Sequence, residues 1–169
     1  MAARPRSGGT PATLALTRAG VSFTEHTYRH DPAASSYGLE AAEVLGLNPE
    51  QVLKTLLVTV DPATGSGRAA LVVGIVPVSA QLDLKAVAAA VRGKKAVMAA
   101  PTDAERATGY VVGGISPVGQ KKTHPTVLDE SALGFEKVYV SGGRRGLDLG
   151  VSPADLIKVT NATVAAIRR

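Results

Sequence analysis

The 169 residues, 45 % of them hydrophobic, suffice for one domain with a core of its own. Cysteine is absent, which excludes disulfide bonds, thiolate metal sites and a cysteine nucleophile, and fits a reducing compartment such as the cytoplasm. No stretch is apolar and long enough for a membrane span, and residues 1–9 lack the apolar run of a signal peptide. The formal net charge of +5 favours an anionic partner such as nucleic acid.

The N-terminal part of the chain is predicted to begin with a flexible tail, residues 1–9, which is rich in Gly, Pro and Arg. The remaining residues, 10–169, are predicted to form one domain. Thr10-Pro11 has the N-cap and first-turn character of a helix start. The pattern then predicts a strand over residues 21–28 and a short helix over residues 38–45.

Two stretches in the middle of the chain, 52–60 and 68–76, consist almost entirely of apolar and β-branched residues. Such composition is typical of strands that are covered on both faces. The intervening residues 61–67 contain a proline and two glycines and predict a turn. We therefore expect an antiparallel hairpin at the centre of a sheet.

The C-terminal half alternates helices and strands less regularly. Asp83 is expected to cap an Ala-rich helix that ends near Val91, and Ser152-Pro153 starts another helix. The remaining predictions are a helix over 101–108 and strands over 96–99, 126–129, 138–141, 147–151 and 163–167. Strands outnumber a simple βαβ alternation, so the predicted fold is α+β with a mixed, curved sheet.

Lys54 is the only charged residue within the apolar stretch 52–60. An ammonium group in such a strand costs free energy unless a partner or a polar cavity receives it. One interpretation is that the side chain lies near the strand start and reaches solvent. The other is that it projects into a pocket, where it binds or polarises a substrate.

The glycine-rich stretch 110–122 has a composition that lets the backbone approach a ligand closely. It nearly forms a phosphate-binding loop, but Gln120 stands where the lysine is required and Pro117 lacks an N–H. The nucleophile elbow Gly-x-Ser-x-Gly is absent as well, because Ser116 is followed by Pro-Val. A structural loop and a ligand-binding loop are both compatible with these residues.

Other polar residues give weaker signals. His26 and His30 lack an acidic or thiol complement, so hydrogen-bonded histidines are expected and no metal site is predicted. Asp148 follows a Gly-Arg-Arg-Gly turn and is on its own an ordinary turn carboxylate. Basic doublets that share one face would suit a phosphate backbone; they occur at Lys94-Lys95, Lys121-Lys122 and Arg144-Arg145.

In combination, several of these stretches resemble the YbaK/EbsC family of aminoacyl-tRNA deacylases, relatives of the editing domain of bacterial prolyl-tRNA synthetase. The resemblance runs from about Thr10 to the C-terminus. The stretches that carry it are residues 26–32, 45–49, 54–58, 81–85, 108–110, 113–117, 119–122 and 139–148.

The resemblance implies a single-domain α+β fold with a mixed, curved, partly barrel-like sheet surrounded by helices. It also implies that Lys54 faces the pocket and is essential. The loop that matches the family's Gly-x-x-x-Pro motif would hold the aminoacyl ester through backbone groups; its residues are Gly113, Gly114, Ile115, Ser116 and Pro117. The remaining matches to family pocket positions are Tyr28, Ser141, Asp148 and Tyr37, the last of which stands where similar proteins carry Phe.

The members most similar to this pattern remove cysteine from the proline tRNA, so the resemblance implies trans-editing of mischarged tRNA, with Cys-tRNA(Pro) as substrate. No cofactor is expected, and prolyl-tRNA synthetase is a candidate partner. The chain has no cysteine and no Ser-His-Asp motif, so a nucleophile of its own is not evident; the substrate thiol could attack the ester, with water as the rival. The alternative function is a tRNA-end or nucleotide-binding module without turnover, which would have no need of a buried lysine.

Overall fold

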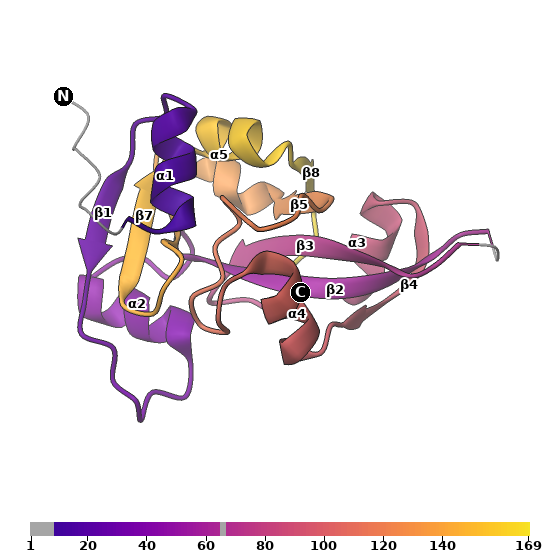
Figure 1. Ribbon diagram of the computed structural model, residues 1–169, viewed down its shortest axis with the longest axis horizontal. Helices are drawn as coiled ribbons and strands as arrows, with labels where there is room; N and C mark the ends of the chain where they lie inside the picture. Colours follow the sequence, from indigo (N-terminus) through magenta and orange to yellow (C-terminus); the bar gives the residue numbers. More distant parts are fainter. Residues whose placement is uncertain (1–8, 65–66) are drawn as a thin grey trace.

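The computed structural model describes residues 9–64 and 67–169 (Figure 1). Its α-helices are α1 (Pro11–Arg18), α2 (Tyr37–Leu45), α3 (Leu84–Ala90), α4 (Pro101–Thr108) and α5 (Pro153–Thr160), and a 3₁₀ helix spans Glu130–Gly134. Its strands are β1 (Thr24–Thr27), β2 (Leu53–Pro62), β3 (Ala70–Pro77), β4 (Gly93–Met98), β5 (Thr126–Asp129), β6 (Val138–Ser141), β7 (Leu147–Val151) and β8 (Thr163–Ala165). Apart from Gly9, the predicted tail lies outside the described residues.

The helix starts follow the predicted capping residues. The side chain of Thr10 accepts a hydrogen bond from the Thr13 N–H at the start of α1, and Asp83 does the same at the start of α3. Ser152 caps α5, which begins with a proline as α1 does. Among the described helices, none has the length and apolarity that crossing a membrane requires.

The larger sheet has five strands in the order β4-β2-β3-β5-β8. β2 and β3 pair antiparallel from Leu53 opposite Pro77 to Val60 opposite Ala70, which confirms the predicted hairpin at the sheet centre. β4 covers the other edge of β2 only from Val58 onward. Among the described strands, none therefore pairs with this edge of the first half of β2.

A second, three-stranded sheet in the order β1-β7-β6 is antiparallel throughout. The expectation of one mixed sheet was therefore wrong in this respect: the described strands form two sheets, joined by the single bridge between Val52 and Tyr139. The partner of a short strand depends on contacts distant in sequence, which its residue pattern does not record. The α+β class is as predicted, whereas partly barrel-like curvature stays a prediction.

The core lies on both faces of the five-stranded sheet. On one face, Leu57 of β2 packs in a cluster with Ala107 of α4 and with buried residues of the three-stranded sheet. On the opposite face, Val58 belongs to a cluster with Val87 of α3. Figure 1 accordingly shows α4 in front of β2 and β3, and α3 behind them. The alternation of side chains along β2 thus divides the core into two layers.

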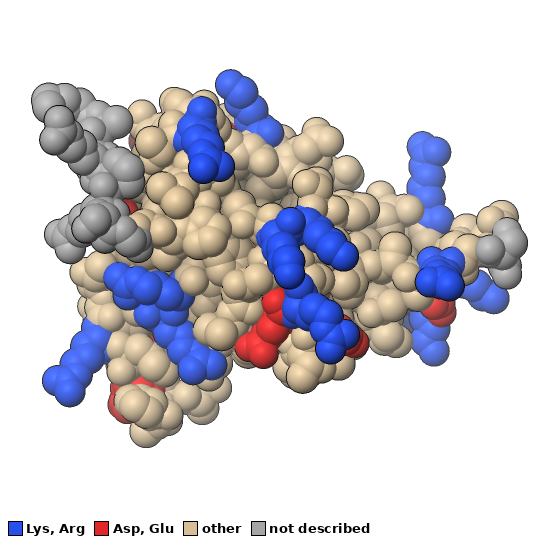
Figure 2. Space-filling model, viewed as in Figure 1, with Lys and Arg blue, Asp and Glu red and all other residues tan. Residues whose placement is uncertain are grey.

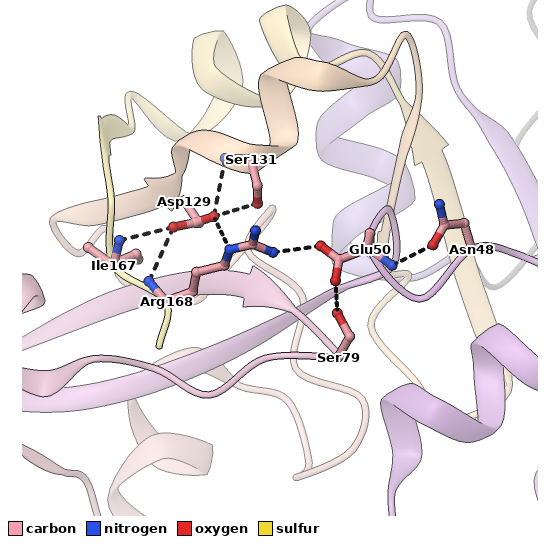
Figure 3. A network of polar contacts seen from close by, with 7 residues as sticks. All are labelled: Asn48, Glu50, Ser79, Asp129, Ser131, Ile167 and Arg168. Atoms are coloured by element: carbon pink, nitrogen blue, oxygen red, sulfur yellow. Dashed lines mark hydrogen bonds and ion pairs between the residues drawn. The ribbon is translucent and has the colours of Figure 1, made fainter.

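A polar network holds the C-terminal residues against the sheet (Figure 3). The buried Asp129 carboxylate at the end of β5 accepts hydrogen bonds from the backbone N–H groups of Ile167 (2.9 Å) and Arg168 (3.2 Å). Its other oxygen caps the 3₁₀ helix by accepting from the Ser131 N–H. The Arg168 guanidinium continues to Glu50, 2.6 Å away. Both oxygens of the buried carboxylate thus accept hydrogen bonds, and these bonds tie the C-terminal residues and the 3₁₀ helix to the end of β5.

Candidate active site

A cavity of about 380 Å³ opens beside the uncovered first half of β2. Its walls come from α2, from the start of α4, from the loop that follows α4, and from the ends of β6 and β7. The hydroxyl and charged side chains that line it are those of Tyr28, Ser35, Ser36, Tyr37, Lys54, Thr55, Ser141 and Asp148. Most of the remaining lining is apolar, as is usual for a site that binds a small organic group.

Lys54 is the second residue of β2, and its half-buried side chain lines the cavity. Burial lowers the pKa of the lysine from its ordinary value because the charged form loses hydration. Within residues 9–64 and 67–169, no carboxylate forms an ion pair with the ammonium group. A cation that is partly desolvated and unpaired in a cavity is suited to bind an anionic or strongly polar group of a ligand.

Asp148 lies on β7, the middle strand of the small sheet, opposite Ser141 of β6 and His26 of β1. Its side chain is only 7 % exposed, and burial raises the pKa of the carboxyl to about 7. Tyr28 follows β1 and lines the same part of the cavity. Burial and the nearby Asp148 raise the pKa of its phenol to about 12, so it remains a hydrogen-bond donor at neutral pH.

Two side-chain hydrogen bonds stabilise the loop after α4. The Tyr110 hydroxyl donates to the carbonyl of Val118 (2.6 Å). The Gln120 side chain, which stands where a phosphate-binding loop would carry lysine, donates to the carbonyl of Ser116 (3.0 Å). These bonds fix the loop while leaving part of its backbone exposed to the cavity.

Two backbone amides of this loop are available to a ligand. Gly113 has a φ of +87°, a conformation that favours glycine, and both Gly113 and Ile115 line the cavity. In the described part of the chain, neither of their N–H groups donates to another residue. Unpaired N–H groups at a cavity wall are the donors from which an oxyanion-binding site is built.

The structure brings together most, but not all, of the residues singled out from the sequence. The cavity lining includes Lys54, Tyr28, Tyr37, Gly113, Ile115, Ser141 and Asp148. Three loop residues are absent from it. Gly114 packs on the backbone of Arg144, and Ser116 and Pro117 are buried, with the Ser116 hydroxyl accepting from the Val118 N–H.

Sequence reasoning missed Thr55, which follows Lys54 and also lines the cavity. Its hydroxyl is the one buried side-chain polar atom without a hydrogen-bond partner among the described residues. Such a group is usually paired in folded proteins, so an unpaired one at a cavity indicates a place for a ligand. Threonine is common in strands, and the sequence therefore gave no reason to select it.

The raised pKa of Asp148 predicts how stability depends on pH. An exposed aspartate in the unfolded chain loses its proton near its ordinary value of 3.8, whereas the folded protein keeps it until about pH 7. The free energy of unfolding should therefore decrease as the pH rises between these values. Asp148→Asn removes the titrating group, and at pH 8 we expect it to be about 2–4 kcal/mol more stable than the wild type.

Denaturant unfolding of both proteins at pH 4 and pH 8 measures this difference. The two proteins should have similar stability at the lower pH, where the carboxyl is protonated in the folded state. A difference between variant and wild type that is the same at both pH values would contradict the raised pKa.

The comparisons with known proteins agree with this site. The family model for the aminoacyl-tRNA editing domain matches residues 31–159, and the chain belongs to this family. The matched region contains the cavity-lining residues Tyr37, Lys54, Gly113, Ser141 and Asp148. The resemblance found from the sequence is confirmed, and so is the class of enzyme, an aminoacyl-tRNA deacylase.

Among individual relatives, EbsC of Enterococcus faecalis, named as a candidate Cys-tRNA(Pro)/Cys-tRNA(Cys) deacylase, is 40 % identical over 126 residues, which cover 75 % of this chain and 73 % of that protein. The crystal structure of a candidate trans-editing enzyme for prolyl-tRNA synthetase is 28 % identical, with a TM-score of 0.76 and coverage of 94 % and 95 % of the two chains. A hypothetical protein of solved structure shares the fold at 24 % identity, with a TM-score of 0.80 and coverage of 94 % and 99 %.

Proposed function

We propose that this protein is a trans-editing hydrolase that removes cysteine from Cys-tRNA(Pro) in the cytoplasm. The single observation that carries the proposal is the composition of the cavity lining beside β2: it combines Lys54, which has no ion-pair partner among the described residues, with Gly113 and Ile115, whose backbone N–H groups form no hydrogen bond there. The names of the relatives support the substrate class. Deacylation of a panel of mischarged tRNAs by the pure protein tests it, and preference for an ester other than cysteine on tRNA(Pro) would overturn the substrate assignment.

The proposed chemistry assigns the ester carbonyl to the free N–H groups of Gly113 and Ile115. Donors that are held in place before the reaction stabilise the negative charge that develops on the carbonyl oxygen. Lys54 adds a positive charge in a partly desolvated position, where its electrostatic effect exceeds that of an exposed lysine. The free Thr55 hydroxyl is available to bond the aminoacyl group and fix its orientation.

The proposed nucleophile is the thiol of the substrate. Its sulfur attacks the ester carbonyl carbon, the bond from that carbon to the tRNA 3′-oxygen breaks, and the 3′-oxygen takes up the thiol proton. The resulting thioester then reacts with water to give free cysteine. The protein has no cysteine, and although serine and threonine hydroxyls line the cavity, no histidine of the described residues lines it to act as their general base, so an activated nucleophile of the chain is not evident there.

Exposed basic residues around the cavity are proposed to bind the tRNA backbone. Figure 2 shows Lys and Arg side chains gathered over α4 and over α2, with a further group at the far end of the β2–β3 hairpin. Lys121-Lys122 adjoins the cavity loop in sequence, and both side chains are exposed. Lys95 of β4, by contrast, lies opposite Asp61 of β2 in the sheet. Asp61 is seven residues beyond Lys54 along this strand, so Lys95 is about 23 Å from the lysine of the cavity.

Salt dependence should reveal these contacts. The logarithm of tRNA affinity is expected to fall linearly with the logarithm of salt concentration, because bound cations are released from the phosphates. Replacing Lys121 and Lys122 by alanine should reduce the slope by about one to two units. Filter binding at several salt concentrations measures the slope, and binding that is insensitive to salt would show that the cavity alone holds the tRNA end.

Prolyl-tRNA synthetase is proposed as a partner that presents the tRNA, supported by the name of a structural relative.

The alternative function, a tRNA-binding module without turnover, shares the basic surface. It gives no role to Lys54 or to the free amides of the cavity, and for this reason the enzyme is the better account of the site.

A further inference from the structure

Arg145 connects two walls of the cavity without lining it. It lies in the turn between β6 and β7, and its guanidinium carbon is 4.9 Å from the centre of the Tyr37 ring. Its Nε donates a hydrogen bond to the carbonyl of Val112 (2.9 Å). Tyr37 belongs to the α2 wall and Val112 to the loop wall, so one side chain contacts both.

The loop after α4 packs closely against the Tyr37 ring and the β6–β7 turn. A Cβ atom on Gly113 would lie 2.8 Å from the Tyr37 ring, and one on Gly114 would lie 2.8 Å from the Cα of Arg144. The loop therefore rests directly on the ring and on the β6–β7 turn. The carbonyl that Arg145 holds belongs to Val112, and the next residue, Gly113, carries the free N–H to which the proposed function assigns the ester carbonyl.

The Tyr37 ring also packs against His30. Its centre is 5.4 Å from that of the His30 ring, and His30 Nδ1 is 2.7 Å from the Glu40 carboxylate. Glu40 is itself buried on α2 and also accepts from the Asp31 N–H (2.8 Å). These contacts restrict the position of the Tyr37 ring, against which the guanidinium group packs.

We propose that Arg145 is a positioning residue, which clasps Tyr37 to the loop at Val112 and thereby fixes the free amide of Gly113. A planar guanidinium can stack on a ring while its Nε donates a hydrogen bond, whereas a lysine ammonium cannot do both in this way. The proposal rests on the proposed function and assigns Arg145 to the site rather than to the tRNA backbone.

The first experiment uses no tRNA. Backbone ¹⁵N order parameters of residues 112–115 are compared in the wild type, Arg145→Ala, Arg145→Lys and the matched control Arg144→Ala. Arg144 is exposed in the same turn and carries the same charge, and within the described part of the chain its guanidinium hydrogen-bonds only to the carbonyl of Arg145, at 3.5 Å. We expect lower order parameters in both Arg145 variants and unchanged ones in the control. Unchanged order parameters in the Arg145 variants would overturn the clasp.

The second experiment separates positioning from tRNA binding. At saturating Cys-tRNA(Pro), Arg145→Ala and Arg145→Lys should each lower the single-turnover rate about tenfold or more, because the amide donors lose their alignment. The affinity for tRNA and its salt slope should change little in Arg145→Lys, which retains the charge. A normal rate at saturation, with a salt slope reduced by about one unit in Arg145→Ala, would identify a phosphate contact and overturn the proposal.

The two experiments distinguish a failure of the proposed function from a failure of the role proposed for Arg145. If the wild type released no amino acid from any mischarged tRNA, the proposed function would fall, while the order parameters would still decide whether Arg145 holds the loop. If Arg145→Ala unfolds, Arg145→Lys supplies the comparison, since it keeps the charge and the aliphatic stem of the side chain while losing the planar guanidinium and its Nε–H bond.

Discussion

Cysteine on tRNA(Pro) should be released at least about 100-fold faster than serine or alanine on the same tRNA, because only the cysteine ester carries a strong nucleophile. In a cavity of about 380 Å³, size alone could supply much of a 100-fold preference over alanine, since one methylene or its equivalent is worth about 1–3 kcal/mol, but it cannot explain a preference over serine, which has nearly the same size. Serine is nearly isosteric with cysteine, but its hydroxyl is almost un-ionised at neutral pH. Single-turnover rates for the three esters measure the difference.

The alanine ester is the matched control, because it lacks any side-chain nucleophile. If cysteine and alanine were released at equal rates, the substrate thiol would take no part and water would be the nucleophile. The amides of Gly113 and Ile115 would keep their role in that case, since both mechanisms develop charge on the same carbonyl oxygen.

Lys54→Ala is expected to lower deacylation by about 100-fold or more, which is the typical cost of removing one group that stabilises transition-state charge. The fold should survive, because replacing a half-buried ammonium by a methyl group relieves its desolvation. Single-turnover deacylation gives the rate, and circular dichroism shows whether the variant is folded.

Lys54→Met is the control for this prediction, because it keeps an unbranched side chain of similar size and removes the charge. It should lose as much activity as the alanine variant. A folded Lys54→Met or Lys54→Ala protein with a rate near that of the wild type would show that the lysine is dispensable, and would remove the main support for the active-site assignment.

The local elements of the fold were predictable because their signals lie within a few residues. Thr10, Asp83 and Ser152 start helices through side chains that bond a backbone N–H three residues later. The division into two sheets was not predictable from such signals. β7 pairs with β1 across more than 100 residues, and nothing in the pattern of either strand specifies that partner.

The candidate site was predictable in part. Lys54 was noticeable as a charge in an apolar strand, whereas Asp148 was assigned only through the family resemblance. The resemblance treated the loop from Gly113 to Pro117 as one unit, but a loop has no regular period, so the sequence could not tell that Gly113 faces the cavity while Ser116 is buried. Arg145 also went unrecognised in this role, because its contacts are made only in three dimensions.

The most direct test of the central claim is the release of cysteine from Cys-tRNA(Pro) by a catalytic amount of the pure protein. We expect release well above the spontaneous rate, with several substrate molecules turned over by each protein molecule and no added cofactor. Stoichiometric binding of the tRNA, without release of cysteine or of any other amino acid from mischarged tRNA, would contradict the account and identify a binding module.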